Sequence, residues 1–255
     1  MSQAREPNRS SSEIWVCHLG VVPYAQALAM QQHLRSLRQA GEIPDSLLLL
    51  EHTAVYTRGR RAGASDLPLG EAHYRERGID VIDVDRGGRV TYHAPGQLVG
   101  YPIMAAPDVV RHVRTIESAI VDALEQRQIH CRARPDDGPD YTGVWARDRK
   151  IASIGVHVQR GVSTHGFAIN VHNELEPFSW VLACGLPDVT MTSVEREHEL
   201  SGAGRRDCAR EMRCVRRLTA DAFARAHSRR QRLVSATALG IQTPAAPRER
   251  ELVSV

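Results

Sequence analysis

The chain almost lacks lysine. Of its 33 Lys and Arg side chains, 32 are arginine and Lys150 is the single lysine. Guanidinium stays protonated in proteins, whereas an ammonium group can lose its proton when its surroundings disfavour charge. Two interpretations stay open from this count alone. Lys150 is either a lysine left by chance on a solvated turn, or an amine that works with a nucleophile elsewhere in the chain.

Other absences exclude whole classes of protein. No apolar run is long enough to span a bilayer, and the polar N-terminus lacks the apolar core of a signal peptide. The five cysteines contain no CxxC pair, and the 12 histidines show no metal-ligand spacing. A net charge of +3 is too small to indicate nucleic acid. We expect a cytoplasmic protein without a membrane segment, a disulfide framework, a metal or a nucleic-acid partner.

Length and composition indicate one globular domain. The chain has 255 residues with 42% hydrophobic and 25% charged content, which is ordinary for a folded protein. Residues 1–12 are polar, and the end of the chain is rich in Pro, Glu and Arg. We therefore expect a disordered N-terminus over 1–12, one catalytic domain over 13–235, and a disordered tail over 236–255. A monomer is the expected state.

Strands alternate irregularly with helices along the sequence. Apolar runs predict strands at 14–19, 46–52 and 79–84, and turn signals predict an antiparallel meander of strands at 142–146, 150–159 and 163–171. Helical spacing predicts helices at 23–40, 107–126 and 209–232, with a shorter one at 174–182 and a loop at 196–207. Because regular strand–helix alternation is absent, we expect an α+β fold with a mixed or antiparallel sheet flanked by helices.

The helix expected at 107–126 has the clearest apolar face. We expect this face to pack in the core. Its residues are Val109, Val113, Ile116, Ile120 and Leu124.

Cys184 is the candidate nucleophile. It stands before Gly185 and Pro187, in a turn of the kind that places side chains at sheet edges. A thiolate is a strong nucleophile, and a nearby cation lowers the pKa of a thiol. The alternative is a small buried hydrophobe, which is the usual role of a free cysteine. Cys17 and Cys131 fit that alternative.

A glycine-rich stretch at 86–97 is the next candidate. It lacks the GxxxxGK[ST] pattern and precedes a strand rather than a helix, which argues against a phosphate loop. Its glycines instead allow the backbone to approach a ligand closely. His93 is a candidate polar group at the end of such a slot, or a hydrogen-bonded structural histidine.

Four segments taken together resemble the octanoyltransferase family of lipoate biosynthesis, which has the biotin/lipoate protein ligase catalytic-domain fold. The segments are 86–102 (RGGRVTYHAPGQLVGYP), 150–156 (KIASIGV), 165–170 (HGFAIN) and 184–186 (CGL). Their order and spacing match that family as well. Ala94 and Ala183 depart from its usual pattern, which has Gly after the histidine and Pro before the cysteine.

The resemblance implies a role for each matched position. Cys184 is expected to accept the acyl group, and Lys150 to lower the pKa of its thiol. No cofactor is implied. The walls of the acyl site are expected at Arg86, Gly87, Gly88, Arg89, Val90, Thr91, Tyr92, His93, Ser153, Ile154, Gly155, Gly166, Phe167 and Ala168.

The implied reaction moves an octanoyl group through a Cys184 thioester. The implied donor is octanoyl-acyl carrier protein. The implied acceptors are lipoyl domains of 2-oxoacid dehydrogenase complexes and the glycine cleavage H protein. An ATP-dependent lipoate or biotin ligase on the same fold and a non-catalytic acyl-binding module are the alternatives.

Six arginines form a candidate basic rim for acidic partners. They are Arg58, Arg60, Arg61, Arg86, Arg147 and Arg149.

Overall fold

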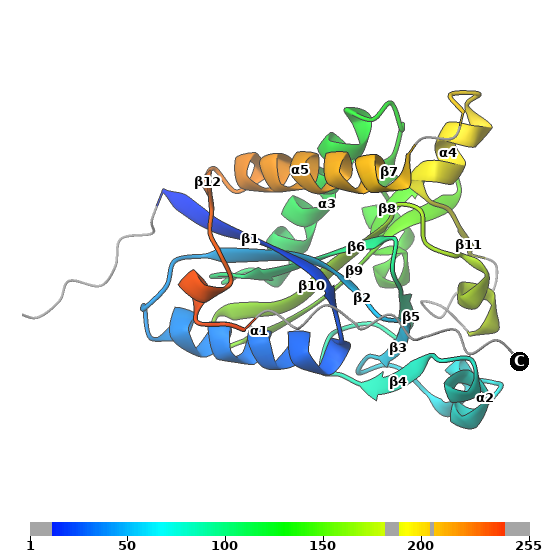
Figure 1. The fold of residues 1–255 in the computed structure, drawn as a ribbon, viewed down its shortest axis with the longest axis horizontal. Helices are drawn as coiled ribbons and strands as arrows, with labels where there is room; N and C mark the ends of the chain where they lie inside the picture. The colour runs from blue at the N-terminus through cyan, green and yellow to red at the C-terminus, as the bar shows by residue number, and fades with distance from the viewer. Residues whose placement is uncertain (1–11, 182–188, 205–206, 243–255) are drawn as a thin grey trace, which may run out of the picture.

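A mixed sheet lies between two layers of helices in the computed structural model (Figure 1). The structure describes residues 12–181, 189–204 and 207–242. Helix α1 (Tyr24–Gln39) covers one face of the sheet. Helices α3 (Val109–Glu125) and α5 (Cys208–Ala226) cover the other. The expected α+β class is therefore confirmed.

The main sheet joins parallel and antiparallel pairs. Strands β12, β1 and β2 pair in parallel, and β2, β6, β10, β9, β8 and β7 pair antiparallel in that order. The expected meander is β8–β9–β10, and the short β11 pairs in parallel with the start of β9. The bounds are β12 (Arg230–Leu233), β1 (Glu13–Val22), β2 (Ser46–His52), β6 (Gln97–Ile103), β10 (Val162–Asn170), β9 (Arg149–Gln159), β8 (Gly143–Ala146), β7 (Arg132–Ala133) and β11 (Thr190–Met191).

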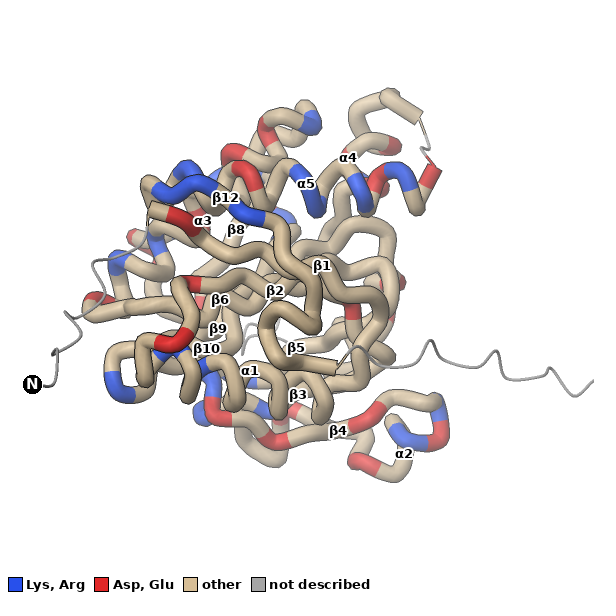
Figure 2. Tube along the Cα trace, turned by 60° about the vertical axis from the view of Figure 1, so that its left-hand side comes forward, with Lys and Arg blue, Asp and Glu red and all other residues tan. Residues whose placement is uncertain are grey.

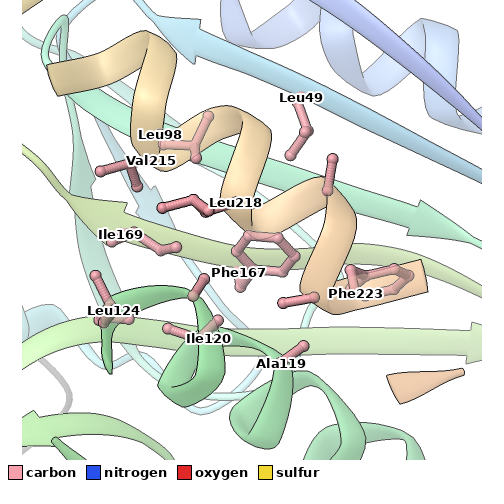
Figure 3. Close-up of a cluster of buried hydrophobic side chains, with 14 of the residues drawn as sticks. Leu49, Leu98, Ala119, Ile120, Leu124, Phe167, Ile169, Val215, Leu218 and Phe223 are labelled. Atoms are coloured by element: carbon pink, nitrogen blue, oxygen red, sulfur yellow. The ribbon is translucent and has the colours of Figure 1, made fainter. Parts of the chain in front are cut away.

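The leucine run of β2 is buried on both faces of the sheet. Leu47 and Leu49 pack toward α3 and α5, while Leu48 and Leu50 pack toward α1. A strand buried on both faces reads as a continuous apolar run, because successive side chains point to opposite faces. Figure 3 shows the α3/α5 side, where Phe167 of the sheet lies against α5.

A second, smaller sheet lies below the main one in Figure 1. Its strands run in the order β4 (Asp80–Asp83), β3 (Val55–Arg58) and β5 (Val90–His93), beside the short helix α2 (Glu71–Glu76). Tyr56, Tyr74, Tyr92 and Phe178 are buried together there. Short 3-10 helices occur at Ala64–Asp66, Pro135–Asp137, Pro139–Tyr141, Glu176–Trp180 and Thr237–Leu239.

Two predicted elements near the C-terminus are wrong. The loop expected at 196–207 contains helix α4 (Val194–Leu200), whose first turn is capped by the Ser193 hydroxyl accepting from Arg196 N. The helix expected to reach 232 ends at Ala226, and the chain continues as β12. The four residues of β12 are exposed and polar or charged except Leu233, so no buried alternation signals a strand.

The arginines expected on the last helix lie along α5 (Figure 2). Several are held by carboxylates from other elements. Arg216 pairs with Glu51 at 3.0 Å, and Arg225 pairs with Asp122 at 2.7 Å. The arginine-rich stretch is thus partly neutralised and ties α5 to the sheet and to α3.

Packing continues past the expected domain boundary at 235. Ala236, Leu239 and Ile241 are buried in the cluster beneath α1. Residues 236–242 therefore belong to the folded domain, while residues 1–11 and 243–255 lie outside the described residues. Within the described ranges, no helix has the length and apolar character needed to cross a membrane.

Candidate active site

A cavity of about 310 Å³ opens where the two sheets meet the start of α3. This volume is at the lower end of the range for small-molecule sites. Lys150 lines it, as do all the expected wall residues except one. Those lining residues are Arg86, Gly87, Gly88, Arg89, Val90, Thr91, His93, Ser153, Ile154, Gly155, Gly166, Phe167 and Ala168.

Tyr92 is the exception. It does not line the cavity and is buried in the tyrosine cluster of the small sheet, with its ring centroid 5.2 Å from that of Tyr56. Neighbouring residues on a strand point to opposite faces, so a wall built from Thr91 and His93 turns Tyr92 away. The expectation that Tyr92 belongs to the wall is therefore not met.

The backbone of the glycine-rich segment is fixed against β9 of the main sheet and against the turn that follows β3. Gly87 N donates to Val156 O of β9 at 3.1 Å, and Arg61 N donates to Gly88 O at 3.0 Å. Arg86 is buried, and its guanidinium donates to Thr57 O and to Thr57 Oγ1 at 2.8 Å each. Arg86 thus anchors the loop that forms one wall.

Lys150 is almost completely buried, with 1% of its surface exposed. Its Nζ lies 5.3 Å from the centroid of the Trp145 ring, within range of a cation–π contact. A Cβ at Gly143 would lie 2.9 Å from Lys150 Cε. Gly143 therefore gives the lysine side chain the room it occupies, and the interpretation of Lys150 as a lysine on a solvated turn is wrong.

A bulge in β9 sets the direction of Lys150. Val144 pairs with Ala152 and Trp145 with Lys150, so Ile151 has no partner of its own on β8. The extra residue interrupts the two-residue alternation of side chains. As a result Lys150 and Ser153, three positions apart, line the same cavity.

His93 belongs to a buried hydrogen-bond chain. Its Nδ1 donates to Gln97 Oε1 at 2.7 Å, since Gln97 Nε2 already donates to Asn170 Oδ1 at 2.9 Å. Asn170 Nδ2 in turn donates to Thr192 O at 3.0 Å. Burial, with His52 and Arg86 nearby, holds the pKa of His93 well below 6.5. His93 is therefore neutral, with the proton on Nδ1.

Two further polar residues line the cavity, although the sequence analysis gave neither a role at the site. Tyr24 and His165 line it, and the Tyr24 hydroxyl lies 3.3 Å from His165 Nδ1. His165 Nε2 donates to Asp85 Oδ1 at 2.7 Å. His165 also has a φ of +56°, which is unusual inside a strand, and its N–H donates to Gln31 Oε1 at 2.7 Å. These contacts join residues 31, 85 and 165, so the HGFAIN segment includes His165 but no local pattern indicates its partners.

The six arginines of the expected rim do not act alike. Arg86 is buried, Arg58 pairs with Asp83 at 2.6 Å, and Arg149 pairs with Glu197 at 2.8 Å. Arg61 lines the cavity and pairs with Asp140, another lining residue, at 2.9 Å. Arg60 and Arg147 are exposed. A continuous basic rim is therefore not what the structure shows.

Cys184 lies outside the described residues, and none of the other cysteines lines the cavity. Cys17 is buried beneath α1, and burial raises the pKa of its thiol to about 11. Burial also raises the pKa of Cys131 to about 12. Thiols of this kind stay protonated and are poor nucleophiles.

Residues 23–206 match the family model of the lipoyl protein ligase A/B catalytic domain. The chain belongs to this family. It is 46% identical to an octanoyltransferase of Acidothermus cellulolyticus over 71% of this chain and 80% of that protein. It is 45% identical to an octanoyltransferase of Rubrobacter xylanophilus over 70% of this chain and 80% of that protein. The expected octanoyltransferase relationship and the acyltransferase class are thus confirmed.

The fold agrees with this family. A lipoate-protein ligase A structure bound with ATP superposes with a TM-score of 0.69, covering 88% of this chain and 89% of that one. Its sequence identity is 18%, so the likeness shows the shared fold alone. The expected biotin/lipoate ligase-like architecture is confirmed by this agreement together with the mixed sheet.

Proposed function

We propose that this protein transfers an octanoyl group from octanoyl-acyl carrier protein to the target lysine of lipoyl carrier domains. The acyl group passes through a thioester on Cys184, and Lys150 assists both steps. The observation that carries the proposal is the buried Lys150 in the wall of the cavity. The octanoyltransferase relatives supply the acyl class, and the lipoyl protein ligase A/B family model supports a lipoyl protein as the acceptor.

The chemical character of Lys150 supports its role. An amine beside a thiol stabilises the thiolate while protonated, and can take up a proton when it is neutral. A guanidinium can do the first but not the second. This difference explains why a chain that otherwise uses arginine retains one lysine at a buried position.

The remaining cysteines support Cys184 by elimination. Four of the five are described, and none of these four lies at the cavity. Val181 and Val189 flank the range that holds Cys184, and both pack in the cluster of the small sheet. Two residues beyond Val189, Met191 pairs with Lys150, and Thr192 N donates to Lys150 O at 3.0 Å. The chain after Cys184 therefore returns to the strand that bears the lysine.

The proposed reaction has two steps. The Cys184 thiolate attacks the thioester carbonyl of the donor, a new C–S bond forms, and the carrier thiolate leaves and takes up a proton. The acceptor amine then attacks the acyl-enzyme, the C–N bond forms, and Cys184 leaves as a thiolate. The amine must be neutral to attack, so a base accepts one proton in this step. Lys150 is the first candidate for this base, with neutral His93 as the second.

A covalent adduct tests the proposal against its alternatives. The protein is incubated with octanoyl-acyl carrier protein without ATP and analysed by intact-protein mass spectrometry. We expect one octanoyl group per chain, absent in Cys184→Ala but retained in Cys17→Ala. A requirement for ATP together with tolerance of Cys184→Ala would instead indicate a ligase. No adduct under either condition would indicate a binding module.

The role of Lys150 is tested separately. Lys150→Arg keeps the charge that stabilises a thiolate but cannot readily give up a proton, so we expect the second half-reaction, which needs a base, to slow by about 10²- to 10⁴-fold. Arg160→Lys is the matched control, because Arg160 lies in the exposed turn at the other end of β9. Single-turnover rates measured for each half-reaction decide the matter. Wild-type rates in Lys150→Arg would show that the proposed role is wrong.

A further inference from the structure

Helix α3 changes its environment along its length. Ile116 and Ile120 are fully buried in the main core (Figure 3 labels Ile120). Val109 and Val113 instead line the cavity, and Val109 is 44% exposed. The expectation that all the apolar positions of this helix face the core is therefore wrong for the first two. The start of α3 is a wall of the site and a part of its rim.

Buried contacts fix this wall relative to Lys150. Glu117 Oε1 accepts from Gly143 N at 3.0 Å, and Glu117 Oε2 accepts from Arg114 Nη1 at 2.6 Å. Gly143 is the residue that leaves room for the Lys150 side chain. Glu117 therefore marks the position along the axis of α3 that lies beside Lys150.

The distances of the two valines from this position follow from helix geometry. Val113 and Val109 lie four and eight residues before Glu117, which is about 6 and 12 Å along the helix axis. Both are on the same helix face, because residues four apart lie one above the other. Val113 thus borders the cavity nearer to Lys150, and Val109 borders it farther away, where it opens to solvent.

We infer that Val113 and Val109 determine which acyl chain lengths the cavity accepts. This inference rests on the proposed function, in which the acyl carbonyl lies at the Lys150 end. Val113 limits the width beside the middle of a medium-length chain. Val109 limits the space for the last carbons of chains longer than octanoyl. Because neither residue falls in the four motifs of the acyl site, both can vary without loss of the catalytic residues.

The size of the effect follows from the transfer of methylene groups. Burying one methylene contributes about 0.8 kcal/mol, which corresponds to about a fourfold change in affinity. A substitution that excludes two methylenes should therefore change the preference between octanoyl and hexanoyl by about 15-fold. This difference is readily measured when the two chains compete.

The test compares three valines of one helix. Val113→Phe, Val109→Phe and the control Val110→Phe are prepared, since Val110 is 68% exposed and does not line the cavity. Each is offered an equimolar mixture of hexanoyl-, octanoyl- and decanoyl-acyl carrier protein, and the adducts are counted by mass spectrometry. Binding of the free fatty acids of the same lengths to Cys184→Ala forms of the three variants is measured by calorimetry.

The expected results differ for each position. Val113→Phe should lower the octanoyl-to-hexanoyl ratio by about 15-fold. Val109→Phe should lower decanoyl uptake by at least fourfold while leaving hexanoyl unchanged. Val110→Phe should match the wild type. An unchanged profile in Val113→Phe, or an equal shift in Val110→Phe, overturns the inference.

Two further measurements distinguish a wrong inference from a variant that does not fold and from a wrong proposed function. If Val113→Phe does not melt cooperatively, Val109→Ala decides instead, with decanoyl expected to gain at least fourfold over octanoyl and an unchanged ratio overturning the inference. If the wild type forms no adduct, the proposed function fails. The calorimetric length profile then still supports the inference when it shifts in the Val113 variant, and overturns it when it does not.

Discussion

The buried His52 predicts a specific loss of stability in acid. Its side chain is fully buried beside the cavity, Nδ1 donates to Val22 O at 2.7 Å, and Nε2 accepts from the Tyr101 hydroxyl at 2.6 Å. Burial lowers the pKa of His52 from 6.5 to about 4. The folded protein therefore keeps His52 neutral at a pH at which the unfolded chain is already protonated.

The sign and size of the effect follow from linkage. Between pH 6.5 and about 4 the unfolded state binds more protons than the folded state, so stability falls as the pH falls. The contribution of His52 is fully present above pH 6.5 and is lost toward pH 4. One pKa unit corresponds to about 1.4 kcal/mol, which gives a loss of about 2 kcal/mol between pH 7 and pH 5.

The measurement is a pair of urea titrations at pH 7 and pH 5. His112 and His93 also have lowered pKa values and contribute in the same direction. The comparison of wild type with His52→Gln isolates His52. We expect the free energy of unfolding to fall by about 2 kcal/mol less in His52→Gln than in the wild type over this range. Equal losses in the two proteins would refute the assignment of a neutral, buried His52.

Two further substitutions test the packing behind the site. Gly143→Ala should destabilise the protein by about 1–3 kcal/mol and displace Lys150, because Gly143 has a φ of +138° and its added Cβ would meet a backbone oxygen at 2.3 Å. Adduct formation and urea unfolding measure this, with Gly20→Ala as the control, since nothing lies within 4 Å of a Cβ there. Phe167→Ala should cost about 3–5 kcal/mol by urea unfolding, because Phe167 is buried against α5. Val110→Ala, at an exposed position, should change stability by less than about 0.5 kcal/mol, and an equal cost in the two would contradict the assigned core.

Much of the fold was predictable because local patterns coincide with burial. The leucine run of β2, the proline before α1 and the turns of the β8–β9–β10 meander each gave an element near its observed bounds. Helix α4 and strand β12 were missed for a physical reason. Both are rich in charged residues and lack a clear apolar period, so α4 depends on its own backbone hydrogen bonds and its Ser193 cap, and β12 on its pairing with β1.

The residues of the site also fall into those that the sequence indicates and those that it does not. Its glycine-rich loop, Lys150 and the strand residues of β9 and β10 have sequence signals, because close approach requires glycine and Lys150 is the single lysine of the chain. Tyr24 and Asp85 have none, and the segment that holds His165 does not indicate its partners, because these contacts join residues 80 and 141 positions apart. Only a folded chain brings such residues within hydrogen-bond distance.

The sequence by itself determined the family, the class of chemistry and the single lysine available for it. Tertiary structure decided where that lysine points. The bulge at Ile151 turns Lys150 into the cavity, Gly143 leaves it room, and Glu117 aligns α3 with it. Register and packing of this kind depend on long-range contacts, which no local pattern encodes. For the same reason Val109 and Val113 proved to be walls of the cavity rather than parts of the core.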